Sequence, residues 1–273
     1  MNRSQFLCIA GSALATPAPN LKGRTFLRPF AAAPFPYPGK PYRDSTIGIY
    51  VPARYRPTDT IDYVVHFHGF CNDVSHVLAR YRLREQLDMS QRNAILIVPQ
   101  GPKDARDDNF GKLEHDTGGF ARLIDEIAAF LRTQGVTQAT RTGKIVLSSH
   151  SGGYGGEAGV IARGGLTGAI TDVIMFDTAY AFYHIFASWV KARPDNHLLS
   201  VFTEDTENGN VYLMSLVQGP QPNIFVRSAH GMTLAQLQTR APTFILATVA
   251  HDELMQRYNW FSLFLQATAL ASV

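Results

Sequence analysis

The chain has few cysteines, no long hydrophobic run and little net charge. Its two cysteines, Cys8 and Cys71, lie far apart and outside any C-x-x-C pair, so no zinc or dithiol redox motif is indicated. Every apolar run is shorter than the about 20 residues of a membrane-spanning helix, so we expect no membrane span. The formal net charge of +3 comes without a block of like charges, which argues against a nucleic-acid partner.

The N-terminal residues have the pattern of an export signal. Arg3 precedes an apolar and small-residue stretch from Phe6 to Leu14, and Ala13-Leu14-Ala15 fits an A-x-A cleavage site. We therefore expect residues 1–15 to be a signal peptide and the protein to be periplasmic or secreted. The alternative is a loosely packed N-terminal arm on a cytoplasmic protein.

The next segment, residues 16–45, is a proline-rich arm. Its composition predicts an extended chain across the domain surface and excludes a helix. The remaining residues, 46–273, show no internal repeat and no interdomain linker, and their number suits one large domain. The least regular part of this domain, about 205–241, is the expected cap or rim insertion.

Apolar strands alternate with amphipathic helices from residue 46 onward. This alternation predicts an α/β fold with a mostly parallel central sheet and helices on both faces. The expected strands span residues 46–52, 62–70, 94–99, 144–147, 172–177, 198–203 and 242–249. The expected helices span 74–81, 120–131, 154–162, 182–191 and 254–270, with a long loop at 100–117. In such sheets functional sites form at the carboxyl ends of the strands.

The stretch Ser149-His150-Ser151-Gly152-Gly153 follows the strand at 144–147 and precedes a helix. Strand, sharp turn, serine and helix are the layout of a nucleophile elbow, whose pattern is G-x-S-x-G. Ser151 occupies the position of the nucleophile, and Ser149 replaces the first glycine. The alternative interpretation is a Gly/Ser-rich turn without chemistry.

Three further strand ends carry side chains that complement Ser151. Asp177 follows the strand 172–176, Glu204 and Asp205 follow the strand 198–203, and His251 follows the last strand. A serine hydroxyl is a poor nucleophile at neutral pH, so an imidazole must take its proton and a carboxylate must orient that imidazole. Serine, acid and histidine in this chain order are typical of one hydrolase class.

On these residues, the span from about 46 to 270 resembles the α/β-hydrolase superfamily, and in particular bacterial serine esterases. The strand ending in His68-Gly69-Phe70 is similar to the turn that supplies half of the family's oxyanion hole. The resemblance implies that the backbone N–H groups of Phe70 and Gly152 bind the oxyanion. His66 and His68 alternate along a strand, so we expect them to face opposite sides and to make core or loop hydrogen bonds.

The resemblance also ranks the candidate base and acid. The family's histidine follows the last strand, which favours His251 over His230. Its acid follows either the strand before the last, which would be Glu204 or Asp205, or the strand before that, which would be Asp177. We predict Asp177, because a carboxylate at the end of so apolar a strand needs a partner.

These residues predict a serine hydrolase that cleaves a carboxylic ester through an acyl-enzyme intermediate, with Ser151, Asp177 and His251 as the triad. Such chemistry requires neither a metal nor an organic cofactor. The expected substrate is a small-molecule or polymer-borne ester. The alternatives are a hydrolase-like binding module without turnover, and a serine peptidase or acyltransferase, which share the acyl-enzyme step.

Overall fold

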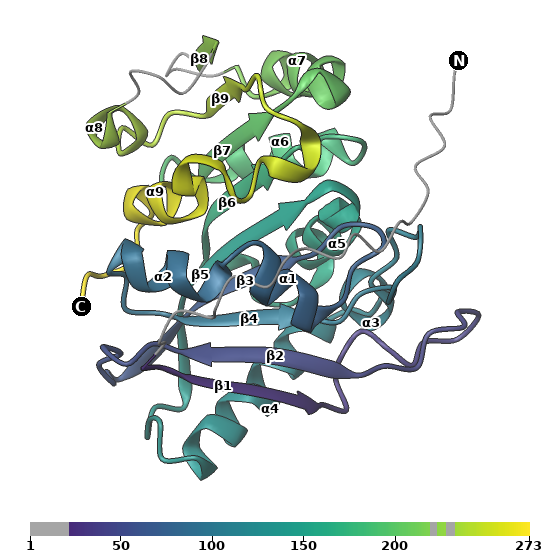
Figure 1. Ribbon diagram of the computed structural model, residues 1–273, viewed down its shortest axis with the longest axis vertical. Coiled ribbons are helices and arrows are strands. Elements are labelled where there is room, and N and C mark those ends of the chain that lie inside the picture. The colour runs from purple at the N-terminus through teal and green to yellow at the C-terminus, as the bar shows by residue number, and fades with distance from the viewer. Residues whose placement is uncertain (1–21, 219–222, 228–232) are drawn as a thin grey trace.

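The nine strands in the described part of the chain form one mixed sheet (Figure 1). This computed structural model describes residues 22–218, 223–227 and 233–273, so the expected signal segment 1–15 and the candidate base His230 lie outside the described residues. The strands are β1 (Arg24–Pro29), β2 (Thr46–Val51), β3 (Thr60–Phe67), β4 (Ile95–Pro99), β5 (Arg141–His150), β6 (Ile170–Phe176), β7 (His197–Phe202), β8 (Ile224–Arg227) and β9 (Thr243–Leu246).

The order of strands across the sheet is β1-β2-β4-β3-β5-β6-β7-β9-β8. Only β2 runs against its neighbours β1 and β4, and all other adjacent pairs are parallel. The predicted mostly parallel sheet is therefore confirmed. Because β3 to β9 run the same way, their carboxyl ends meet at one edge of the sheet.

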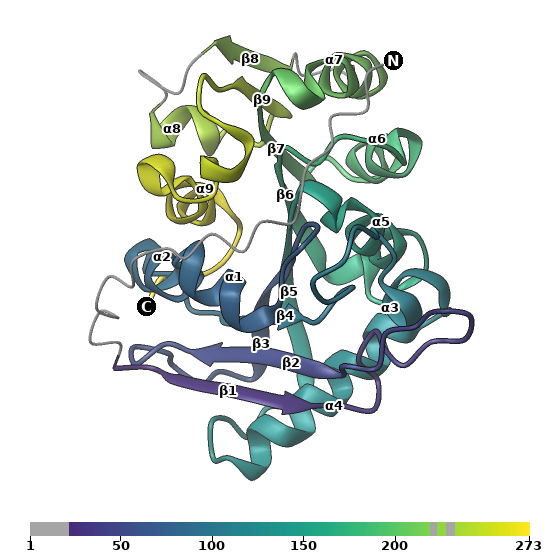
Figure 2. The same cartoon turned by 45° about the vertical axis from the view of Figure 1, so that its right-hand side comes forward.

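Helices cover both faces of this sheet, as the alternation of strands and helices predicts. They are α1 (Val74–Arg80), α2 (Leu83–Ser90), α3 (Gly111–His115), α4 (Gly119–Thr133), α5 (Tyr154–Arg163), α6 (Tyr183–Ala192), α7 (Glu207–Leu216), α8 (Leu234–Leu237) and α9 (Trp260–Ala267). Figure 2 shows α1, α2, α8 and α9 on one side and α3 to α7 on the other. The molecule is thus a three-layer sandwich.

Each face of the sheet has its own hydrophobic core. On β3, Tyr63, Val65 and Phe67 point into the core beneath α4 and α5. Val64, between them, points into the core beneath α1, α2 and α9. A strand buried on both faces carries apolar residues at every position, which explains the near-continuous apolar runs.

The proline-rich arm contributes a strand to the sheet, so the sheet begins before residue 46. β1 pairs antiparallel with β2, with Arg24 opposite Val51. Its side chains are mostly exposed, as expected for the arm, but Phe35 beyond it is fully buried. Pro29 is tolerated because it ends an edge strand, where one row of backbone groups has no ladder partner.

Two other segments differ from the sequence-based expectations. The segment 205–241 was expected to be a cap or rim insertion, and its described part supplies α7, α8 and the edge strand β8, which pairs with β9. The C-terminal helix expected at 254–270 spans only α9. Tyr258 and Asn259, with φ values of 56° and 50°, adopt left-handed backbone conformations that interrupt it.

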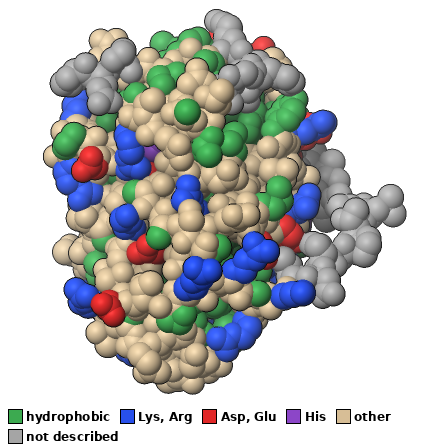
Figure 3. Space-filling model, turned by 90° about the vertical axis from the view of Figure 1, so that its left-hand side faces the viewer, with side chains coloured by type: hydrophobic (Ala, Val, Ile, Leu, Met, Phe, Trp, Pro, Cys, Tyr) green, Lys and Arg blue, Asp and Glu red, His purple; other side chains and the backbone are tan. Residues whose placement is uncertain are grey.

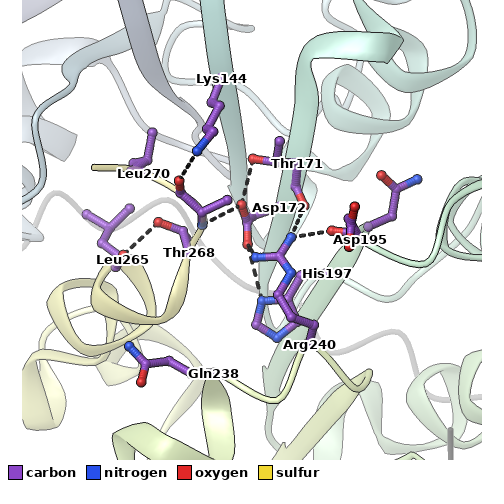
Figure 4. A network of polar contacts seen from close by, with 12 residues as sticks. Lys144, Thr171, Asp172, Asp195, His197, Gln238, Arg240, Leu265, Thr268 and Leu270 are labelled. Carbon is purple, nitrogen blue, oxygen red and sulfur yellow. Dashed lines mark hydrogen bonds and ion pairs between the residues drawn. The ribbon is translucent and has the colours of Figure 1, made fainter. Parts of the chain in front are cut away.

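A buried carboxylate ties the C-terminal segment to the sheet at the amino end of β6 (Figure 4). Asp172 accepts a hydrogen bond from Arg240 at 2.9 Å and lies 3.2 Å from His197 Nδ1. The backbone N–H of Ala269 also donates to it, at 3.2 Å. Asp172 therefore joins β6, β7, the segment before β9 and the chain after α9 at the edge of the sheet opposite its carboxyl ends.

The surface carries dispersed charge. Figure 3 shows Lys and Arg side chains spread over the face on which α2 and the C-terminus lie, with acidic and hydrophobic side chains among them. Within the described ranges, no helix combines the length and apolar character needed to cross a bilayer.

Candidate active site

The turn between β5 and α5 has the geometry of a nucleophile elbow. β5 runs up to His150, three residues further than predicted, and the short 3-10 turn Ser151–Gly153 leads directly into α5. Ser151 has a φ of 52°, in the left-handed region that a non-glycine residue adopts only under constraint. The serine hydroxyl is thereby presented at the carboxyl edge of the sheet.

Close backbone packing around the elbow explains the glycines on either side of it. A Cβ atom on Gly153 would lie 2.3 Å from the carbonyl oxygen of Phe67. A Cβ on Gly69 would lie 2.7 Å from the Cβ of Ser151. The turn after β3 therefore packs directly against Ser151.

Asp177 is fully buried directly after β6 and accepts four hydrogen bonds. Its Oδ1 accepts from the backbone N–H of Thr203 at 2.9 Å and from the hydroxyl of Thr206 at 2.5 Å. Its Oδ2 accepts from the hydroxyl of Thr203 at 2.5 Å and lies 2.7 Å from His251 Nδ1. Burial acts to raise the pKa of Asp177, but these hydrogen bonds outweigh it and hold the pKa below its ordinary value. Asp177 is therefore a carboxylate at neutral pH.

His251 follows β9 and points its Nδ1 at Asp177. Burial acts to lower the pKa of His251, but the hydrogen bond and charge of Asp177, with the charges of Asp252 and Asp205, raise it above its ordinary value. Asp205 is exposed and joins Asp177 and His251 in a group whose oxygen and nitrogen atoms lie within 4.8 Å of one another. Asp177 alone of these carboxylates makes the hydrogen bond to His251 in the described residues.

This group is a poor candidate for a metal site. Asp177 already accepts hydrogen bonds from Thr203, Thr206 and His251 on both of its oxygens. The ring nitrogen of His251 nearest the group is engaged with Asp177. A cation there would have to displace these donors, so the donor set fits a carboxylate–imidazole pair better than a cation cage.

The residue before the serine, His150, connects the elbow to His251. The rings of His150 and His251 lie 4.8 Å apart, and His150 Nε2 is 3.3 Å from the backbone oxygen of His251. Burial, with the neighbouring His251, lowers the pKa of His150 to about 3, so His150 stays neutral. Within the described chain no hydrogen bond joins the Ser151 hydroxyl to the His251 ring. Catalytic hydrogen bonds are often long without substrate and tighten in the reacting complex.

The turn after β3 is held by His68. The backbone N–H of Gly101 donates to His68 Nε2 at 2.9 Å, so the proton of the neutral ring is on Nδ1 and faces the Gly69 carbonyl oxygen at 2.9 Å. His66 faces the other side and lies 3.1 Å from the hydroxyl of Ser148. The prediction that His66 and His68 make core and loop hydrogen bonds on opposite sides is confirmed.

Phe70 and Gly152, the two residues whose amides were predicted to bind an oxyanion, are in contact. A Cβ on Gly152 would lie 2.4 Å from the ring of Phe70. Phe70 is 40% exposed, so it forms part of the surface beside Ser151.

Aromatic side chains form a wall next to the serine. Tyr154 lies 5.8 Å from the ring of Tyr180 and 6.0 Å from that of Phe182, and both of these partners are exposed. Burial and the charges of Asp177 and Asp205 raise the pKa of Tyr180, and a side-chain hydrogen bond with Ser151 counteracts them. The hydroxyl of Tyr180 therefore lies beside the serine.

Sequence reasoning missed the hydroxyl side chains around the acid. Thr203 and Thr206 flank Glu204 and Asp205, and only the two carboxylates were considered as site residues. The signal that could have found the threonines is their place at a strand end, where small hydroxyl groups can satisfy a buried carboxylate.

No protein-family model matches this chain, and no curated protein matches it. Solved structures do. The feruloyl esterase module from Clostridium thermocellum, in complex with sinapinate, aligns with a TM-score of 0.62 over 93% of this chain and 90% of that chain, at 10% sequence identity. A ferulic acid esterase aligns with a TM-score of 0.57 over 90% of this chain and 98% of that chain, at 8% identity. At such identities the comparison establishes a shared fold.

Proposed function

We propose that this chain, which has the α/β-hydrolase fold, is a serine hydrolase that cleaves carboxylic esters through an acyl-enzyme. The observation that carries the proposal is the 2.7 Å contact between Asp177 Oδ2 and His251 Nδ1 at the sheet edge where Ser151 sits in a left-handed turn. The fold neighbours named above are esterases, which supports the same reaction class.

The proposed reaction begins with attack of Ser151 Oγ on the ester carbonyl carbon. His251 Nε2 takes the serine proton, and Asp177 stabilises the imidazolium that forms. The N–H groups of Phe70 and Gly152 stabilise the oxyanion, each worth about 3 kcal/mol where one such donor has been removed elsewhere. The C–O bond to the alcohol then breaks, and the alcohol leaves with the proton from His251. Water, activated by the same imidazole, releases the acid and restores Ser151.

The wall of Tyr154, Tyr180 and Phe182 supports an ester of an aromatic acid as the substrate. Aromatic rings stack at centroid distances of 4.5–7 Å and contribute about 0.5–1.5 kcal/mol per pair beyond area burial. The fold neighbours are named for feruloyl or ferulic acid esters, and one holds sinapinate. We therefore expect kcat/KM to be higher for methyl ferulate than for methyl butyrate. Phe182→Ala should lower the preference for methyl ferulate over methyl butyrate, measured as the ratio of the two kcat/KM values, roughly threefold to tenfold. Leu27→Ala, on the exposed strand β1, should leave this preference unchanged.

The first experiment compares Ser151→Ala with the wild type in hydrolysis of p-nitrophenyl acetate and in labelling by a fluorophosphonate probe. The variant should lose at least roughly 10⁴-fold in kcat, because the other residues of a triad contribute little without the nucleophile, and should not be labelled. Ser215→Ala, an exposed serine of α7, is the matched control and should retain both. A wild type that is neither active nor labelled would contradict the proposal and favour a binding module.

A further inference from the structure

Three buried side chains form a chain of hydrogen bonds behind the elbow. Glu157 Oε2, from α5, lies 2.5 Å from the hydroxyl of Ser149. Ser149 Oγ lies 3.2 Å from Thr178 Oγ1, and the hydroxyl of Thr178 donates to the backbone oxygen of Ser151 at 2.7 Å. All three side chains are fully buried. We call Glu157, Ser149 and Thr178 the buried relay.

The surroundings of Glu157 favour its neutral form. Burial raises the pKa of Glu157 to about 8, although a hydrogen bond that Ser149 donates to the ionised carboxylate acts to lower it. Its second oxygen, Oε1, has no hydrogen-bond partner among the described residues. An ionised carboxylate with an unpaired buried oxygen would be costly, whereas a carboxylic acid can donate.

When Glu157 is neutral, all hydrogen bonds of the buried relay donate in the same direction, from Glu157 toward Ser151. The acid O–H donates to Ser149, the Ser149 hydroxyl donates to Thr178, and the Thr178 hydroxyl donates to the Ser151 carbonyl. Three hydrogen bonds then use three hydrogens, and each hydroxyl group both donates and accepts once. Hydrogen bonds in such a chain polarise one another, so each bond, including the one to the Ser151 carbonyl, is stronger than it would be alone.

The relay ends on the peptide group that carries one of the oxyanion donors. The Ser151 carbonyl and the Gly152 N–H belong to the same planar trans peptide, in which C=O and N–H point in opposite directions. A donor that fixes the carbonyl oxygen therefore also fixes the direction of the N–H. It also draws electron density toward the oxygen, which makes the N–H a stronger donor.

We propose that Glu157, Ser149 and Thr178 are positioning residues that aim and polarise the Ser151–Gly152 peptide toward the oxyanion of the reacting ester. The inference rests on the proposed serine hydrolase function. It gives Ser149 a role that the family's glycine cannot have, because glycine would end the relay before Thr178.

The test compares Thr178→Val, which removes the hydroxyl at nearly equal volume, with Thr178→Ser, which keeps it. Loss of a whole oxyanion donor costs about 10²–10³ in kcat, so loss of the bond behind it should cost roughly tenfold. We expect Thr178→Val to lower kcat for p-nitrophenyl acetate by about that factor with KM within twofold of the wild type, and Thr178→Ser to remain near the wild type. Affinity for an aryl trifluoromethyl ketone, which forms a tetrahedral oxyanion adduct with the serine, should fall with kcat.

A second pair of variants tests the far end of the buried relay. Glu157→Gln keeps a donor that can reach Ser149 and should retain kcat, whereas Glu157→Met, of similar size, has no donor and should lose severalfold. Ser149→Ala combined with Thr178→Val should cost no more than Thr178→Val alone, because both break the same chain.

The possible results distinguish failure of the buried relay from failure of the proposed serine hydrolase function. An active wild type with Thr178→Val at unchanged kcat and inhibitor affinity, and with unchanged thermal stability, would overturn the relay alone. If Thr178→Val does not fold, equal kcat in Glu157→Met and Glu157→Gln would overturn it. A wild type without activity and without fluorophosphonate labelling would remove the proposed function, and the relay with it.

Discussion

Asp177 and Asp205 both lie near His251, and their different contacts give them different expected roles. Asp177 is buried and bonded to the ring, whereas Asp205 is exposed and contributes only charge. Asp177→Asn should therefore lower kcat by about 10⁴-fold, as expected when an imidazole loses its orienting carboxylate. Asp205→Asn should change kcat by less than about twofold when kcat is measured at a pH where it no longer varies with pH. Equal losses in both variants would contradict the assignment of Asp177 as the acid.

The pH profile tests the same residues. The proposed base, His251, can take a proton only when it is neutral, and its pKa is raised, so the proposal predicts that activity is lost as the pH falls through that raised pKa. The acid limb of kcat/KM should therefore lie above pH 6.5, the ordinary value for histidine. Removing the charge of Asp205 should move this limb to lower pH. A limb at the same pH in Asp205→Asn would show that Asp205 does not act on the base.

At the scale of elements, α5 packs unusually closely against α3 through glycine. A Cβ on Gly159 would lie 2.5 Å from the Cα of Glu114, a backbone atom that cannot move alone. Gly159→Ala should lower the free energy of unfolding by about 1–3 kcal/mol through overpacking, measured by urea denaturation. Gly168→Ala, where a Cβ would meet nothing within 4 Å, is the matched control and should change little. Equal stability of the two variants would show that α3 shifts to make room for the added methyl group.

Elements in which a hydrophobic period repeats over many residues could be predicted from the sequence, and short or strained elements could not. The stripe of Phe120, Leu123 and Ile127 predicts α4 because its period is helical and its face is buried. α3 has five residues, too few to show a helical period, so the sequence predicts a loop there. β1 was not expected because its exposed side chains give no core-facing alternation.

For the site, strand ends predicted Ser151, Asp177 and His251, and the structure brings the last two into contact. Thr203 and Thr206 were not predicted, because a threonine near a turn has no sequence pattern that sets it apart from a solvated one. The role of Ser149 depends on Glu157, which is eight residues away on a helix whose orientation only the fold supplies.

At the scale of the whole molecule, Asp172 and Asp177 form two buried Asp–His pairs at opposite ends of β6. Burial acts to raise the pKa of Asp172, but His197 and Arg240 hold it below its ordinary value. A carboxyl with a depressed pKa stabilises the fold above the unfolded pKa of about 3.9, and this stabilisation is lost as the pH falls through the folded pKa. The stability of the wild type should therefore decline in acid below about pH 4.

Asp172→Asn should cost about 3–5 kcal/mol at neutral pH, because it leaves Arg240 and His197 without their charged partner. The kcat of the folded fraction should be retained, since Asp172 lies at the far end of the strand from the site. Asp116→Asn, which removes an exposed ion pair with Arg122, should cost less than about 1 kcal/mol. Guanidinium unfolding followed by activity at equal folded fraction measures both, and a loss of kcat in Asp172→Asn would contradict a purely structural role.

The strand order has a consequence for how the molecule assembles. β9 follows β8 in the chain and is the last of the described strands, yet it lies between β7 and β8 in the sheet. β8 therefore has no strand to pair with until β9 is inserted, and His251 lies in the short 3-10 turn that comes after β9. A chain in which β9 is not yet inserted therefore leaves β8 without its partner and does not yet hold His251 beside Asp177.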